Sequence, residues 1–218
     1  MRIMRLIATD GSYNLYAKVL DSAKVGGVPQ HRDRLYIIGI LKSADDKSFE
    51  FPEEFEHGGM ASILEKKRPN ETQIPPASQS TARDNLLAAM KAIMKDCEPA
   101  THPCIIDLDS TKWNWRYDES LCLTRSRGLS GGFFVTNRGR RLTVNEQMRL
   151  QAYNPNRIDT CCISERQLAG AVGNSMTVSV VERILLRALP AAGLVRSSAL
   201  NRRWENRADA KKQLSKMF

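Results

Sequence analysis

Residues 27–41 read Gly-Val-Pro-Gln-His-Arg-Asp-Arg-Leu-Tyr-Ile-Ile-Gly-Ile-Leu, a polar loop followed at once by a short apolar run. The run, residues 35–41, is typical of a strand that is buried on both faces. Arg32 and Arg34 stand two positions apart in the extended stretch before it, so they point to the same side. Two guanidinium groups beside a sheet end can hold a planar heterocycle or a phosphate, although arginines in a loop are also often simply solvated.

Patterns on either side of this loop predict a mixed α/β chain. Residues 13–20 alternate as a strand does, with Leu15, Ala17 and Val19 on one face. Residues 42–82 are polar and acidic without a sustained period, which predicts loop. Further strands are expected at 104–108, 121–124 and 132–136, and helices at about 83–97, 143–151 and 177–189, the first capped by Thr81 and the last ended by Pro190.

The composition limits the classes of protein to which the chain can belong. Its 218 residues are 42% hydrophobic and 26% charged, which is typical of globular proteins. No stretch approaches the ~18 apolar residues of a membrane-spanning helix, and Arg5 and Asp10 interrupt any signal-type apolar run. The five cysteines form no Cys-x-x-Cys pair. They predict reduced, buried thiols in an intracellular protein, with neither a disulfide scaffold nor a metal site.

The distribution of charge points to a polyanionic partner. The chain has 33 basic and 24 acidic residues, and its net charge is +9. Residues 42–59 are acidic, whereas residues 121–141 hold five arginines and no acid. Because the planar guanidinium can bond two oxygens at once, arginine suits phosphates and the edges of guanine bases.

Two later segments add possible site residues. In residues 141–151, Thr143 and Glu146 have the spacing of a capping box, which predicts a capped amphipathic helix. Residues 167–177 read Gln-Leu-Ala-Gly-Ala-Val-Gly-Asn-Ser-Met-Thr and precede the last helix. Their glycines predict a tight turn, which either cradles a carboxylate at a helix start or merely caps the helix.

The order of these segments resembles the carboxyl half of a DNA (cytosine-5)-methyltransferase. Its elements are GVPQxRxR before a strand, a variable stretch of about a hundred residues, RxLTxxExxRLQ, and GNS at a helix start. The resemblance covers roughly residues 13–189 and implies an α/β fold: a partial, Rossmann-like S-adenosylmethionine-dependent methyltransferase sheet with an inserted mixed α+β target recognition domain. It divides the chain into the end of the catalytic domain (1–41), the recognition domain (42–140), a return to the catalytic domain (141–190) and a basic tail (191–218).

The resemblance also implies a chemistry and a set of site residues. Enzymes of this family transfer a methyl group from S-adenosylmethionine to C5 of a flipped cytosine, after a cysteine thiolate has added at C6. By this resemblance Arg34 would contact the flipped base, and Gln30 and Arg32 would brace its loop. The cofactor pocket would be lined by Asn174, Ser175 and Met176. Contacts to DNA would come from Thr124, Arg125, Arg127, Arg138 and Arg140.

The nucleophile of the family is not among these 218 residues. It lies in a Pro-Cys-Gln motif ahead of the QxRxR segment, and the sequence contains no such motif. Pro103-Cys104-Ile105 lacks the glutamine and falls in the expected recognition domain. We therefore expect a carboxyl-terminal portion, whether a split subunit, a truncated gene product or a degenerate remnant. Such a portion would be inactive without an amino-terminal half that carries the cysteine.

Two alternatives stay open at this point. The arginine cluster and the basic tail also fit a non-catalytic nucleic-acid-binding remnant. Residues 122–124, Cys-Leu-Thr, are loosely similar to a segment of relatives that methylate transfer RNA, so the partner is expected to be DNA with RNA not excluded. The expected location is intracellular, in the nucleus if the organism is a eukaryote, and no membrane partner is expected.

Overall fold

The structure, a computed structural model, describes residues 11–69 and 71–218. Its strands are β1 (Tyr13–Asp21), β2 (Asp33–Leu41), β3 (Cys104–Asp107), β4 (Asn114–Tyr117), β5 (Phe134–Val135) and β6 (Arg140–Arg141). Its helices are α2 (Ser22–Val25), α3 (Ser80–Ile93), α4 (Arg125–Leu129), α5 (Val144–Leu150), α6 (Glu165–Asn174), α7 (Val178–Ala191) and α8 (Arg207–Ser215). Within the described ranges, none of the helices combines the length and apolarity that crossing a bilayer requires. The expectation for Arg5 and Asp10 concerns residues outside those ranges.

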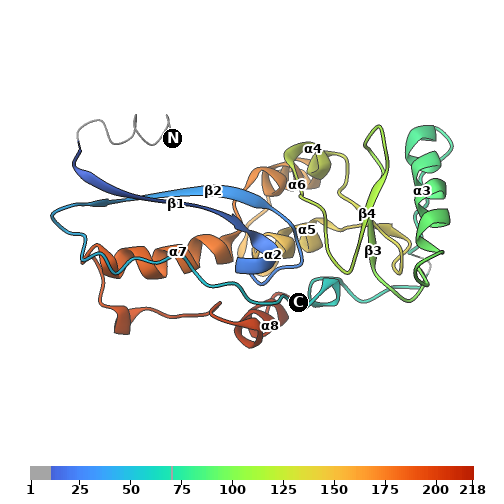
Figure 1. The fold of residues 1–218 in the computed structure, drawn as a ribbon. Coiled ribbons are helices and arrows are strands. Elements are labelled where there is room, and N and C mark those ends of the chain that lie inside the picture. Colours follow the sequence, from blue (N-terminus) through green and yellow to red (C-terminus); the bar gives the residue numbers. More distant parts are fainter. Residues whose placement is uncertain (1–10, 70) are drawn as a thin grey trace.

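The two strands that flank the arginine loop form an antiparallel pair that lies along α7 (Figure 1). Tyr13 stands opposite Leu41 at one end, and Asp21 stands opposite Asp33 at the other. The inner face of the pair buries Leu20, Tyr36 and Ile40 against α7. The strands predicted from the alternation of residues 13–20 and from the apolar run of residues 35–41 are therefore both confirmed.

The outer face of this pair is uncovered, so the prediction that residues 35–41 are buried on both faces is wrong for the described chain. Leu35 is 58% exposed and Val19, its partner across the pair, is 59% exposed. The physical reason is that α7 covers one side only, and no other described element covers the second side.

A second, four-stranded sheet has the order β4-β3-β5-β6 and lies with α3 at the other end of the molecule (Figure 1). The strand expected at 104–108 is confirmed as β3, whereas the one expected at 121–124 is wrong. There Thr124 accepts a hydrogen bond from the backbone N–H of Arg127 and caps the short helix α4. The cap of α3 is also different, because Gln79 and not Thr81 precedes its first turn.

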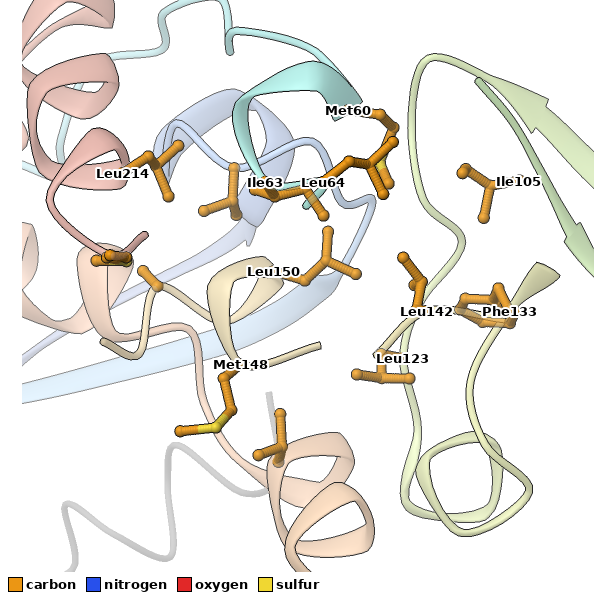
Figure 2. Packing of buried hydrophobic residues seen from close by; sticks show 14 of the residues in the cluster. Met60, Ile63, Leu64, Ile105, Leu123, Phe133, Leu142, Met148, Leu150 and Leu214 are labelled. Carbon is orange, nitrogen blue, oxygen red and sulfur yellow. The ribbon is translucent and has the colours of Figure 1, made fainter. Parts of the chain in front are cut away.

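The main hydrophobic core joins these parts and includes the last residues of the chain. Met60, Ile63, Leu123 and Leu150 meet in it, and Leu214 of α8 packs against them (Figure 2). The segment expected to be a basic tail thus folds back onto the protein. Its buried apolar residues are Trp204, Ala210, Leu214 and Met217, and the last three have the i, i+4, i+7 spacing of one helix face.

The glycines of residues 167–177 serve close packing and do not form the predicted turn. Gly170 and Gly173 lie inside α6, a ten-residue helix that opens with a capping box from Ser164. A Cβ atom at Gly173 would lie 2.2 Å from the carbonyl oxygen of Thr124, and one at Gly128 would lie 2.1 Å from that of Ala169. The missing side chains let α4 and α6 approach backbone to backbone.

Two smaller expectations also need correction. Pro190 lies within the last turn of α7, which continues to Ala191, and so does not stop that helix. Cys161 and Cys162 are exposed at the surface, in the loop before α6, and are not the buried thiols that the composition suggested.

Replacing Gly173 by alanine is expected to lower the free energy of unfolding by about 1–3 kcal/mol, because the new methyl group overlaps a backbone oxygen that cannot move aside. Gly170→Ala is the matched control on the same helix, since its nearest neighbour is the flexible end of Leu129 at 2.8 Å. Urea denaturation of both variants measures the difference. Equal effects at the two positions would contradict this account of the α4–α6 contact.

Candidate functional site

Gln30 fixes the loop between β1 and β2 from inside the protein. Its side chain is 0% exposed. The amide nitrogen donates to the carbonyl oxygen of Leu150 at 2.9 Å, and the amide oxygen accepts from the backbone N–H of Leu123 at 2.8 Å. One side chain therefore ties the loop to the end of α5 and to the segment that leads into α4.

Arg32 makes the second connection, and its guanidinium is almost completely buried at 4% exposure. Nη1 donates to the carbonyl oxygen of Leu123 at 2.5 Å, and Nη2 donates to that of Ser175 at 2.5 Å. Burial lowers the pKa of Arg32 below its usual value, because the charged form is taken out of water. The two carbonyl oxygens compensate for part of that loss, and the fork geometry of the guanidinium allows both bonds at once. The bracing role expected for Gln30 and Arg32 agrees with these contacts.

Arg34 is only partly buried and has a different set of neighbours. Nη1 donates to the adjacent carbonyl oxygen of Asp33 at 2.7 Å, and Nη2 lies 3.8 Å from the sulfur of Cys122. In the described chain its guanidinium forms no ion pair with a carboxylate. Donor positions of this cation are therefore free to bind a ligand.

The two arginines and the Asn-Ser-Met segment share one hollow of about 600 Å³. The hydrogen bond between Arg32 and Ser175 joins positions that are 143 residues apart in the sequence. The prediction that these segments lie beside one shared hollow agrees with this geometry. The hollow is lined by Arg32, Arg34, Thr124, Arg125, Ser126, Leu129, Gly173, Asn174, Ser175 and Met176.

Asn174, Ser175 and Met176 lie between two helices, at the end of α6 and before the start of α7. Asn174 and Met176 are exposed, whereas the Ser175 hydroxyl donates to the carbonyl oxygen of Val172 at 2.7 Å. All three residues also line a second, more apolar hollow of about 660 Å³ along α7. The segment thus stands between a basic hollow and an apolar one.

The arginines expected to contact DNA fall into two groups. Arg125 is exposed in the hollow beside Thr124. Arg127 instead pairs with Asp107 at 2.8 Å, and Arg138 donates to the carbonyl oxygen of Glu65 at 2.9 Å.

Arg140 is the clearest departure from that expectation. It is 2% exposed and binds both oxygens of Glu146, at 2.8 and 3.0 Å. Burial by itself would lower the pKa of Arg140, but the bonds to Glu146 outweigh it and raise the pKa above the usual value. The pair is structural, and the guanidinium does not reach the surface.

Cys104, in β3, does not have the environment of a nucleophile. Burial, together with the thiol of Cys97 3.4 Å away, raises the pKa of Cys104 to about 12. The thiolate needed for attack is therefore scarce at neutral pH. This agrees with the expectation that Cys104 is not the nucleophile.

Sequence reasoning missed three neighbours of the arginines: Cys122, Ser126 and Leu129. The sulfur of Cys122 lies within 3.8 Å of both guanidinium groups, and the other two residues line the hollow. The available signal is their position in or just after the Cys-Leu-Thr-Arg-Ser-Arg stretch, whose first residues predict a strand although Thr124 starts a helix.

The C-5 cytosine-specific DNA methylase family matches residues 2–189 of the chain. The chain belongs to this family. Members of the family use S-adenosylmethionine as the methyl donor. Two curated relatives agree: the type II methyltransferase M.NgoBI of Neisseria gonorrhoeae is 32% identical over 173 residues, and M.HaeII of Haemophilus aegyptius is 30% identical over 178 residues. The matches cover 78% and 79% of this chain but 49% of each relative, so the chain spans about half the length of these two relatives.

Solved structures support the α/β methyltransferase fold. The methyltransferase EhMeth of Entamoeba histolytica superposes with a TM-score of 0.54 at 15% identity, covering 87% of this chain and 57% of its own. The Dnmt2 methyltransferase of S. pombe gives a TM-score of 0.53 at 17% identity, with 87% and 62% coverage. At these identities the likeness concerns the fold alone.

Replacing Arg32 by lysine is expected to lower the free energy of unfolding by about 1.5–3 kcal/mol, because a single ammonium cannot satisfy the carbonyl oxygens of both Leu123 and Ser175. Arg34→Lys, two residues away, is the control and is expected to change stability by less than about 0.5 kcal/mol. Chemical denaturation of both variants tests this. A loss at Arg34 as large as at Arg32 would show that the two side chains do not divide their roles in this way.

Proposed function

We propose that this chain forms the base-binding and DNA-facing part of a DNA cytosine-5 methyltransferase. It acts together with an amino-terminal half, supplied by the rest of a longer polypeptide or by a second one. The observation that carries the proposal is the shared hollow, in which Arg34, Arg125 and Asn174 meet from three distant segments. Folding alone does not require Arg34 and Arg125 to meet, because neither side chain takes part in the core.

Arg34 is the proposed contact for the flipped cytosine. Its guanidinium has unbonded donor positions and is part of the lining of the hollow. When a nucleophile adds at C6 of the base, negative charge develops on the ring and its O2 atom. A fixed guanidinium beside that oxygen stabilises the charge as it forms.

Thr124 and Arg125 are the proposed contacts to the DNA backbone or to base edges. Both are exposed on the same wall of the hollow. Residues 42–140, with the sheet β4-β3-β5-β6 and helix α3, are accordingly proposed as the target recognition domain. Arg127, Arg138 and Arg140 are left out of the proposed contacts because each is already bonded within the protein.

Asn174 and Met176 are the proposed cofactor-side residues. Among the described residues, the Asn174 side-chain amide forms no hydrogen bond, so both its donor and its acceptor are available to a polar ligand. Ser175 differs, since its hydroxyl and its carbonyl oxygen are bound to Val172 and Arg32, and it holds the backbone of the segment in place. S-Adenosylmethionine, when bound there, supplies an electrophilic methyl group.

The outer face of the β1–β2 pair supports the need for an amino-terminal half. Its eight residues include no charged side chain: Tyr13, Leu15, Ala17 and Val19 from β1, and Leu35, Ile37, Gly39 and Leu41 from β2. An exposed apolar face of this kind is typical of a surface that another element covers. The length of the curated relatives, about twice the matched part, supports the same interpretation.

Transfer of tritiated methyl groups to DNA tests the proposal, with the chain mixed with the amino-terminal half of a family member that carries Pro-Cys-Gln. We expect activity only in the mixture, and we expect Arg34→Ala to lower turnover about 10²–10³-fold. Arg202→Ala, an exposed arginine outside the hollow, is the control and should leave turnover unchanged. Activity of the chain alone, or full activity of the Arg34 variant, would refute these assignments.

DNA binding separates the enzyme from a non-catalytic binder. Affinity for a duplex should fall steeply with salt, and S-adenosylmethionine should strengthen it if the cofactor and DNA sites form one pocket. Salt-sensitive binding without methyl transfer in any mixture would favour the remnant. Methylation of transfer RNA in preference to DNA would favour the RNA alternative.

A further inference from the structure

A histidine inside the arginine loop connects four segments of the chain. His31 lies between Gln30 and Arg32, and both of its ring nitrogens face carboxylate oxygens. Nδ1 lies 2.6 Å from Oδ2 of Asp21, and Nε2 lies 2.5 Å from Oε2 of Glu119. The other oxygen of Glu119 lies 3.0 Å from Nε2 of His57. The cluster borders a hollow of about 590 Å³ that is separate from the one lined by Arg34.

The two carboxylates of this cluster are ionised. Burial opposes the charge of Asp21, but hydrogen bonds from the backbone N–H groups of Arg32 and Ala23 and from His31 outweigh it, so the pKa of Asp21 lies below its usual value. Burial opposes the charge of Glu119 in the same way, and the bonds from His57 and His31 lower the pKa of Glu119 below its usual value. Neither carboxyl group can therefore donate a proton to the ring at neutral pH.

The arrangement of donors and acceptors indicates which ring nitrogens donate. His57 accepts the backbone N–H of Gly59 at Nδ1, which leaves its Nε2 as the atom that donates to Glu119. His31 has an ionised acceptor at each ring nitrogen, and both bonds form only if both nitrogens carry protons. A neutral ring would bring one bare nitrogen against a carboxylate oxygen at close range.

The bridge supports a backbone contact at the same place. Gln30 pairs with Ser120 in a parallel bridge, the Ser120 N–H donates to the carbonyl oxygen of Pro29, and the His31 N–H donates to that of Ser120. His31 thus holds the arginine loop to the segment after β4 through its side chain as well as its backbone. No group of His, Cys, Asp and Glu in the described ranges has a metal-binding arrangement, and this cluster is no exception.

We propose that His31, as an imidazolium between Asp21 and Glu119, is a positioning residue that sets where Arg34 stands relative to Arg125. The link to methyl transfer rests on the function proposed above, but the bridge itself does not. Loss of the ring charge would release Glu119, loosen the loop and move Arg34. The other ionisable groups around the bridge are Lys24 of α2, Arg116 of β4, and Glu54, Glu56 and His57 of the acidic segment.

Nuclear magnetic resonance of the whole chain tests the bridge directly, because the chain has only three histidines. Ring ¹⁵N shifts at neutral pH should show both nitrogens of His31 protonated and His57 neutral. In Glu119→Gln, which removes one carboxylate but keeps the shape, His31 should lose its proton at a lower pH than in the unmodified chain, and the resonances of Arg34 and Leu123 should shift with that loss. His57→Gln is the matched control, since it keeps both partners of His31 and can still donate to Glu119; there His31 should stay charged.

A bare ring nitrogen on His31 in the unmodified chain would overturn the proposal. So would unmoved Arg34 and Leu123 resonances in a Glu119→Gln chain whose His31 is neutral. If that variant does not fold, raising the pH of the unmodified chain gives the same test. The resonances of Arg34 and Leu123 should then shift together with the deprotonation of His31, while those of Ile184 in the α7 core stay unchanged. Resonances of Arg34 and Leu123 that do not follow His31 would reject the inference.

The methyl-transfer assay adds a readout that separates the two proposals. In the mixture with an amino-terminal half, Glu119→Gln should lower kcat about tenfold or more and leave the KM for DNA nearly unchanged, because a misplaced Arg34 affects the reacting base. An inactive mixture with the expected resonances would reject the proposed function alone. An active mixture with a neutral His31, or with kcat unaffected in Glu119→Gln, would reject the positioning role alone.

Discussion

The buried guanidinium of Arg32 is the contact on which the arrangement of the site depends. A cation at 4% exposure loses its hydration and must recover it from fixed partners. Here the partners are carbonyl oxygens of Leu123 and Ser175, which belong to segments far apart in the chain. Neither segment can move away without leaving a buried charge short of acceptors. The positions of the loop, of the α4 start and of the α6 end are therefore set together.

Arg34 has a different role because of strand geometry and burial. It lies two residues after Arg32 and points to the same side, but it is beyond the reach of the carbonyl oxygens that bind Arg32. Its neighbours are the carbonyl of Asp33 and the sulfur of Cys122, both weak competitors for a guanidinium. One arginine of the pair thus builds the wall of the hollow, and the other remains available inside it.

Local signals in the sequence predicted the elements whose formation is local. The alternation of residues 13–20, the apolar run of 35–41 and the capping box at Thr143 all correspond to observed elements. Gly170 and Gly173 misled because glycine signals a turn and close packing equally well, and only the partner α4 distinguishes the two. The ion pairs of Arg127 with Asp107 and of Arg140 with Glu71 were also beyond local reasoning. Asp107 is 20 residues from Arg127, and Glu71, the second partner of Arg140, lies far upstream in a segment without a regular pattern.

Besides the bond from Arg32 to Leu123, three contacts hold residues 42–140 against the rest of the chain beside the hollow. Gln30 binds the backbone of Leu123, Gly128 of α4 packs on α6, and His31 binds Glu119. They differ in kind: a buried amide, a backbone-to-backbone approach and a charged bridge. Only the third depends on a titratable side chain, so the first two fix the segment at every pH and the third alone can vary. The backbone of Leu123, which Arg32 binds, leads directly into α4 and Arg125. The wall of the hollow that carries Arg125 and the loop that carries Arg34 are therefore held together by the same contact.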